Sequence, residues 1–479
     1  MTATTKTLLS PHPDRLLPAD PGLRTLARTL YESVADARIF SPHGHVDAQV
    51  LLGDEPFPDP AALLVTPDHY VTRVMHSLGV GLDQLGLGGP VEPRGVWRTF
   101  CTHWDAYLGT ASRYWLEVEL YDIFGIDVQP SAETADEIFD AIAARLAEPA
   151  YRPRALFQQF GIDVLATTDD PVADLSAHAA LAADDDFPGA VVPTFRPDRF
   201  VDPSADGWQR AVSELGEVTG RDTNRMSEFL DALRDRRRHF IERGGSATDH
   251  GTADTGSQPL SASDAASLHS KGIAGTISAE EATAYRRNML FEMARMSSED
   301  GLVMQLHPGV LRNHHRPTQR AFGSDTGHDI PTLTGFAAGL RPMLEEFGTH
   351  PRFRIVLFTV DETAFARDIA PLAGFYPSVF IGAPWWFLDA PDAISRFRTA
   401  VTETAGFYKT AGFVDDTRAF CSIPARHDLS RRVEASYLAR LVAEHRISEA
   451  DAHRIIHDVV VTLPRHVFTR IDGADPGMA

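Results

Sequence analysis

Short apolar runs recur along the chain, and most of them end in a cluster of polar residues. Their near-continuous apolar character over a few residues is typical of strands that are buried on both faces. We therefore predict strands at 38–42, 163–168, 190–195, 246–248, 301–306, 354–359, 378–383 and 412–415. The pattern at 246–248 is the weakest of the eight.

Between several of these runs, apolar residues recur at helical spacing. The pattern over 279–296 predicts a helix that Ser278 can cap. Residues 208–241 predict two helices with a break between them. A further amphipathic helix is expected over 429–444, with Asp428 as its capping residue.

Alternation of strands and helices predicts a parallel sheet covered by helices, and eight such units favour a closed barrel. The expected fold is therefore α/β, a (β/α)8 barrel in one elaborated domain over 1–479. The active sites of such barrels lie at the carboxyl ends of the strands.

Two segments are longer than the connections of a minimal barrel. We expect 48–160, after the first strand, to be a helical insertion, and the polar segment 244–278 to be a flexible loop.

Composition excludes several classes of function. The formal net charge is −21, with 45 basic and 66 acidic residues, so nucleic acid and acidic membrane surfaces are unfavourable partners. Cys101 and Cys421 are the only cysteines, no stretch is long enough for a membrane span, and the amino terminus does not resemble a signal peptide. We expect a cytoplasmic protein that acts on a small molecule; the sequence leaves a homo-oligomer open.

A metal site is indicated where the first predicted strand ends, at His43-Gly44-His45. Residues two apart in a strand point the same way, so both imidazoles can face one ion. At the end of the last predicted strand, Asp416 and Arg418 also share a face. That carboxylate could be a metal ligand, a general base or both, and the guanidinium could hold it or an anionic substrate group. Ordinary strand-end histidines and a helix-capping Asp are the alternative interpretations.

Other strand ends carry further candidates. His307 could reach the metal or the substrate, or be structural, and Arg196 would suit a substrate carboxylate. Asp169 and Asp170 could simply cap the next helix. Other templates fail, because the chain has no Gly-x-Gly-x-x-Gly after a strand, no P-loop, no Gly-x-Ser-x-Gly and no Cys-x-x-Cys.

An ordered set of motifs resembles the uronate isomerase (glucuronate isomerase) family of the amidohydrolase superfamily. The motifs are IFSPHGHVD, PDHYVTRVMHSLGV, TADEIFD, LATTDDP, PTFRPDR, ATDHG, QLHPGVLRN, GAPWWF and GFVDDTRAF followed by Arg426-His427. The resemblance implies interconversion of D-glucuronate with D-fructuronate, and of D-galacturonate with D-tagaturonate. It also implies one divalent metal, usually zinc.

Carried over position by position, the resemblance implies roles for individual residues. His43, His45 and Asp416 would be the metal ligands. The reacting end of the sugar would be surrounded by His69, Tyr70 and Arg418. The rest of the sugar would be held by Arg196, Trp385 and Trp386. From the residues alone, the His69-Tyr70 pair shows no local mechanism.

The chemistry expected is proton transfer through an enediolate, with Asp416 as the base near C2 and the metal, Arg418 and Tyr70 stabilising the oxyanion. One alternative is a metal-dependent hydrolase of the amidohydrolase type, although no residues for a second metal are evident. Another is a catalytically silent sugar-acid binding protein, which would not need a base such as Asp416.

Overall fold

The computed structural model describes residues 6–472. Its centre holds parallel strands in two hydrogen-bonded groups, in the orders β1-β2-β3 and β4-β5-β8-β9. The strands are β1 Ile39–Ser41, β2 Ile162–Ala166, β3 Ala190–Val192, β4 Ala247–His250, β5 Val303–Leu306, β8 Ile355–Leu357 and β9 Val379–Ile381. Most of their side chains are buried, which explains why the sequence shows apolar runs rather than an alternating pattern.

Three contacts close these groups into a ring. A parallel bridge between Phe195 and Thr248 joins the end of β3 to β4, and another joins Ile381 of β9 to Thr410. The segment after Thr410 then returns to β1, where the backbone N–H of His45 donates to the carbonyl of Thr417 at 3.0 Å. The predicted (β/α)8 barrel is confirmed, although residues 412–415, predicted as a strand, have no regular secondary structure.

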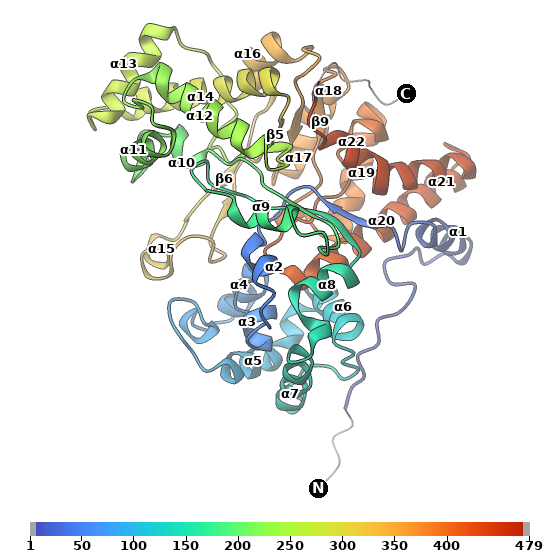
Figure 1. Cartoon of the computed structure of the whole chain (residues 1–479). Helices are drawn as coiled ribbons and strands as arrows, with labels where there is room; N and C mark the ends of the chain where they lie inside the picture. Colours follow the sequence, from blue (N-terminus) through green and yellow to red (C-terminus); the bar gives the residue numbers. More distant parts are fainter. Residues whose placement is uncertain (1–5, 473–479) are drawn as a thin grey trace.

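Helices cover the outside of the barrel (Figure 1). They are α1 Pro21–Glu32, α9 Ser176–Ala182, α10 Asp198–Val201, α11 Trp208–Thr219, α12 Met226–Ile241, α13 Ala262–Ile273, α14 Ala279–Asp300, α15 Arg316–Phe322, α16 Ala337–Phe347, α17 Glu362–Ala364, α18 Ala370–Ala373, α19 Pro391–Ala405, α20 Ile423–Ala443, α21 Glu449–His457 and α22 Leu463–Val467. Figure 1 shows α11–α14 gathered on one side of the strands and α20–α22 on the other. None of the described helices is long and apolar enough to cross a membrane.

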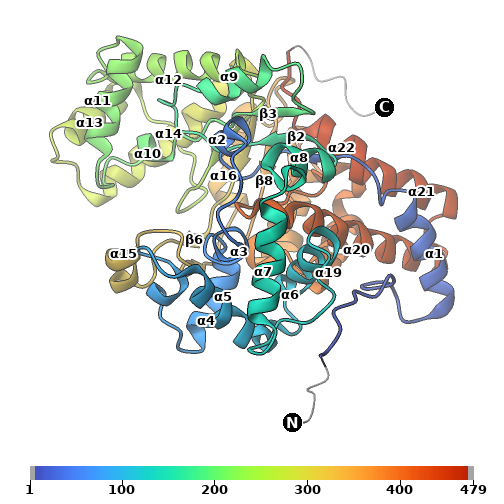
Figure 2. The same cartoon turned by 60° about the horizontal axis from the view of Figure 1, so that its bottom comes forward.

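The segment between β1 and β2 is helical, and it lies together on one side of the molecule (Figure 2). Its helices are α2 Ala48–Gly53, α3 Pro60–Leu64, α4 His69–Ser77, α5 Pro93–Thr102, α6 Ala111–Val118, α7 Ala135–Leu146 and α8 Pro153–Gln159. Side-chain caps start several of them; Asp59, for example, accepts a hydrogen bond from the N–H of Ala62. A shared apolar cluster joins these helices to β1 and β2, so the segment is packed onto the barrel.

The expectation of a flexible loop over 244–278 is wrong. This segment contains the fully buried strand β4 and the helix α13. Ser261 caps α13 by accepting from the N–H of Asp264. Small residues let α13 pack closely, since a Cβ at Gly272 would lie 3.0 Å from the ring of Trp208. A composition rich in Ser, Gly and Ala therefore does not indicate disorder here, and one face of α13, with Ala265 and Gly272, is buried.

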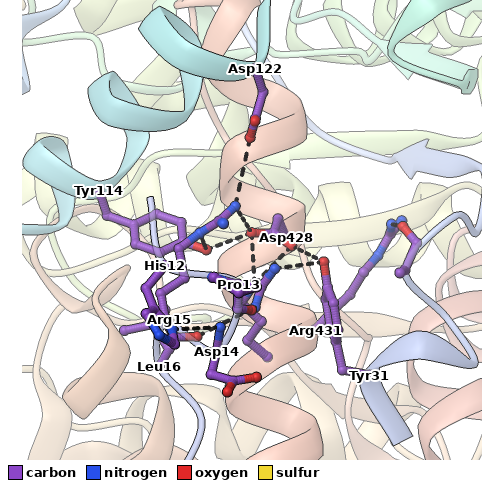
Figure 3. A network of polar contacts seen from close by, with 12 residues as sticks. His12, Pro13, Asp14, Arg15, Leu16, Tyr31, Tyr114, Asp122, Asp428 and Arg431 are labelled. Atoms are coloured by element: carbon purple, nitrogen blue, oxygen red, sulfur yellow. Dashed lines mark hydrogen bonds and ion pairs between the residues drawn. The ribbon is translucent and has the colours of Figure 1, made fainter. Parts of the chain in front are cut away.

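The predicted helices occur, with one boundary shifted. Ser278 forms a capping box with Glu281 at the start of α14. α20, however, begins at Ile423, so Asp428 lies inside the helix and does not cap it. Asp428 instead accepts hydrogen bonds from Arg15, Tyr31, Tyr114 and Arg432, as Figure 3 shows in part. A carboxylate with so many tertiary donors cannot be told from a capping residue by sequence pattern.

Candidate active site

A cavity of about 300 Å³ opens at the carboxyl ends of the barrel strands. Most residues predicted to form the site line this cavity. They are His45, His69, Tyr70, Arg196, Trp385, Trp386, Asp416 and Arg418, together with Asp68, Arg312, Asn313, Ser324, Asp325 and Thr417. The lining comes from the barrel, from the insertion and from the segment that follows β5, so residues far apart in the chain meet here.

His43, His45 and Asp416 form one compact group. The Nε2 atoms of His43 and His45 lie 3.4 and 3.0 Å from Oδ1 of Asp416. The exposed fraction of the His43 side chain is only 2%, whereas that of His45 is 26%, on the cavity side. Burial alone would raise the pKa of the Asp416 carboxyl, but the two imidazoles hold that pKa well below its ordinary value.

The donor set of this group fits a divalent metal ion. All three ligand atoms lie within 4.8 Å of one another. In a tetrahedral zinc site with ligand distances of about 2.0–2.2 Å, ligand atoms are about 3.3–3.6 Å apart. The separations of 3.4 and 3.0 Å from Asp416 are close to that spacing. Imidazole nitrogens and a carboxylate are also ligands that suit such an ion, so these residues could hold a metal.

Backbone geometry aims these ligands at one point. Asp416 adopts a φ of 39°, in the left-handed region that a short polar residue tolerates better than most. Between the two histidines, a Cβ at Gly44 would lie 3.4 Å from the carbonyl oxygen of Ala166, because this residue faces the neighbouring strand. The side chains of His43 and His45 therefore share one side of the chain and Gly44 faces the other, as the alternation in a strand predicts.

The insertion supplies His69 and Tyr70, at the first turn of α4. Asp68 caps this helix by accepting from the N–H of Tyr70 at 2.8 Å. The rings of His69 and Tyr70 stack with centroids 4.9 Å apart. Burial lowers the pKa of His69 to about 4, so its imidazole is neutral at pH 7. Both ring nitrogens are buried and have no hydrogen-bond partner within the described protein.

Arg196 and His307 are linked by a carboxylate that the sequence analysis did not single out. Asp249, at β4, lies 3.2 Å from Nη1 of Arg196 and 2.7 Å from Nδ1 of His307. His307 stacks on His43 with centroids 4.8 Å apart and is buried. The structure thus places Arg196 at the cavity wall and His307 one layer deeper, outside the lining. The only signal for Asp249 was its place in the ATDHG motif.

Aromatic and charged residues complete the wall. Trp385 and Trp386 follow β9, and both are mostly buried. Arg418 lies 3.4 Å from Asp325, and Arg312 lies over the ring of Trp386 at 5.1 Å. Arg312 and Asp325 come from the excursion between the short strands β6 Val310–Leu311 and β7 Ile330–Pro331, which includes α15.

Sequence patterns did not assign the excursion to the site. Arg312 was visible only as part of the motif QLHPGVLRN, and Asp325 had no signal. The excursion lies beside the insertion in Figures 1 and 2. A Cβ at Gly88 would approach Phe322 of α15 to 2.9 Å, which shows how closely the two segments pack.

Comparison with known proteins identifies the family. A sequence profile described as "Glucuronate isomerase" matches residues 23–468, nearly the whole chain. The chain belongs to this glucuronate isomerase family. It is 52% identical to the uronate isomerase of Corynebacterium efficiens over 95% of this chain and 98% of the relative.

Solved structures of the family have the same fold. The glucuronate isomerase of Caulobacter crescentus superposes with a TM-score of 0.95 at 44% identity, covering 98% of this chain and all of that one. For the uronate isomerase of Thermotoga maritima the TM-score is 0.91 at 30% identity, with 95% and 99% covered. The predicted family and the isomerase class of this enzyme are confirmed. A hydrolase or a silent binding protein is not favoured.

Proposed function

We propose that this isomerase interconverts D-glucuronate and D-fructuronate, and D-galacturonate and D-tagaturonate, in the cavity at the carboxyl ends of the strands. The observation that carries the proposal is the meeting of Asp416, His69, Tyr70 and Arg418 in one cavity beside a possible set of metal ligands. Membership of the glucuronate isomerase family supports the choice of substrate.

The cavity offers guanidinium groups to an anionic sugar. Although the chain carries a net charge of −21 and three carboxylates line the cavity, the guanidinium groups of Arg196, Arg312 and Arg418 line it as well. Guanidinium groups match carboxylates in geometry and charge. We propose that Arg196 helps to hold the sugar acid, with the rings of Trp385 and Trp386 covering its carbon chain.

The proposed reaction moves two protons. Asp416 removes the proton from C2 of the open-chain aldose and returns it to C1, while a second proton passes from O2 to O1. The enediolate formed between these steps carries charge on oxygen, which Arg418 and the phenol of Tyr70 stabilise. We assign exchange of the proton between the oxygens to neutral His69, whose ring nitrogens have no partner in the described protein.

We propose zinc as the resident metal, held by His43, His45 and Asp416. Such an ion would act as a Lewis acid toward the oxygens at the reacting end of the sugar. Asp416 would then combine ligation with proton transfer.

An assay with the two sugars tests the proposal. The purified enzyme is incubated separately with glucuronate and galacturonate, and formation of each ketose is followed, with metal analysis of the same sample. Turnover of glucuronate is expected, and Asp416→Asn is expected to abolish it because an amide cannot accept the proton. Failure of the wild-type enzyme to form ketose from either sugar would refute the proposed substrates.

Isotope exchange distinguishes proton transfer from a hydride shift. In D2O, deuterium is expected at C1 of the ketose, partially if Asp416 is shielded from solvent. Complete absence of deuterium over many equilibrating turnovers would contradict the enediolate route, and sustained turnover by Asp416→Asn would exclude Asp416 as the base.

A further inference from the structure

A buried ion pair lies directly behind Tyr70. Nη1 of Arg426, on α20, is 2.6 Å from Oδ2 of Asp389, and the exposed fractions of the two side chains are 1% and 2%. Nε of Arg426 also donates to the hydroxyl of Ser422 at 3.0 Å. Neither residue lines the cavity, and the mechanism above uses neither.

The guanidinium of Arg426 lies over the rings of Tyr70, which lines the cavity, and of Trp115, which packs against Tyr70. It lies 3.6 Å from the ring centroid of Trp115 and 5.0 Å from that of Tyr70. Trp115 meets Tyr70 edge to face with centroids 5.4 Å apart, and Tyr70 stacks on His69. Arg426 therefore places a positive charge behind the stacked rings of Tyr70 and His69, which line the cavity.

Asp389 links the ion pair to Trp386, which lines another part of the cavity wall. It directly follows the turn Trp386–Leu388, and its N–H donates to the carbonyl of Trp386 at 3.2 Å. Trp386 has a φ of 54°, a conformation that is strained for a tryptophan and needs support from its surroundings. The ring of Trp386 meets that of His69 edge to face, so both ends of the pair support the residues around His69.

Stability alone does not account for the position of this pair beside Tyr70. Desolvating two charges costs so much that apolar replacements are often equally stable or better. Moreover, Nη2 of Arg426 and Oδ1 of Asp389 are buried without partners in the described protein, so the pair is not fully satisfied. A charge kept under these conditions beside Tyr70 has a direct electrostatic effect on the phenol, because little water screens it.

We propose that Arg426 is a positioning residue that acts through Tyr70: it fixes the ring and makes the phenol a stronger hydrogen-bond donor to the oxyanion. Asp389 holds the guanidinium in place and couples it to the Trp386 turn. The inference rests on the role proposed above for Tyr70. Burial raises the pKa of Tyr70, and Arg426 opposes this rise more strongly than Asp389, whose negative charge acts in the other direction, adds to it.

A double-mutant cycle tests the coupling. The neutral replacement Arg426→Gln with Asp389→Asn removes both charges without leaving one unpaired, and it is combined with Tyr70→Phe. With Tyr70 present, the replacement is expected to lower kcat about ten- to a hundredfold with a much smaller change in KM, since charge on the oxyanion develops after binding. In the Tyr70→Phe background, the same replacement is expected to change kcat less than about threefold.

A matched buried pair between α19 and α20 provides the control. Arg398 and Glu434 are 2.6 Å apart with exposed fractions of 2% and 4%, and neither lines the cavity. The double variant Arg398→Gln with Glu434→Gln is expected to lower thermal stability. Any relative loss of kcat that it causes should be the same in the Tyr70 and Tyr70→Phe backgrounds. Circular dichroism and metal content report whether each variant is folded.

The outcomes are distinguishable. Equal losses of kcat in the two Tyr70 backgrounds would overturn the inference, because Arg426 would then act without the phenol. Wild-type kcat in Tyr70→Phe alone would instead refute the proposed role of Tyr70. If the neutral replacement does not fold, Arg426→Lys is taken through the same cycle. This change keeps the charge but loses the planar contact with Trp115. The inference again requires a loss of kcat that depends on the Tyr70 hydroxyl.

Discussion

Replacing Asp428 tests how α20, the helix that carries Arg426, is held in place. Substitution by Ala removes the acceptor shared by Arg15, Arg432 and the hydroxyls of Tyr31 and Tyr114 (Figure 3). These donors come from the N-terminal segment, α1, α6 and α20 itself. The change therefore leaves two guanidinium groups and two phenols without their common partner, at the helix that also carries Arg426.

The expected cost can be worked from the contacts. Breaking a buried charge pair by removing one partner costs about 3–5 kcal/mol. Because 17% of the Asp428 side chain remains exposed, we take the lower end, about 3 kcal/mol. Unfolding entropy near 2.1 cal/mol/K per residue gives roughly 1 kcal/mol/K for a chain of this length, so Tm should fall by about 3 °C.

Differential scanning calorimetry at pH 7 measures this change. The matched control is Asp122→Ala, since Asp122 lies 3.7 Å from Arg15 in the same network but has 48% of its side chain exposed. Its loss should cost about 0–1 kcal/mol, or less than about 1 °C. Equal shifts for the two variants, or an unchanged Tm for Asp428→Ala, would refute the reasoning.

The same variant predicts a pH dependence. Burial would raise the pKa of Asp428, but Arg432, Arg15 and the two phenols hold it below its ordinary value. A carboxyl group with a depressed pKa in the folded state contributes stability above its unfolded pKa of about 3.9, and this contribution is lost as pH falls through the folded value. The difference in Tm between wild type and Asp428→Ala should therefore be full at pH 6–7 and shrink below about pH 4. A constant difference down to the acid transition would contradict this account.

Three further predictions concern the site. Replacing His43 and His45 together with Ala should lower bound metal and isomerase activity while circular dichroism stays unchanged; full metal content in this variant would exclude them as ligands. Arg196→Lys keeps the charge but loses the planar fork, so KM for uronates should rise about tenfold, and unchanged kinetics would make Arg196 structural. Asp325→Asn removes a negative charge 3.4 Å from Arg418, so KM for the anionic substrate should fall two- to fivefold at low salt, and an unchanged or higher KM would show that Asp325 does not compete with the substrate.

Some of this architecture follows directly from the sequence. Barrel strands are buried on both faces, so they appear as short apolar runs, and the run before His43 predicts β1 within a residue or two. The alternation of side chains in a strand is equally local, and for this reason the shared direction of His43 and His45 needed no tertiary information. Ser278 could be recognised as a cap because a capping box involves residues only three apart.

Other features depend on residues that meet only in the folded chain. His69 and Tyr70 lie on a helix of the insertion, and nothing in their neighbourhood along the sequence shows that α4 faces the barrel mouth. Asp249 and Asp325 gain their importance from arginines that approach from distant parts of the chain. Hydrophobic periodicity reports which side of an element is buried, but not what it packs against. The pairing of Arg426 with Asp389, and of both with Tyr70, was therefore decided by the tertiary structure.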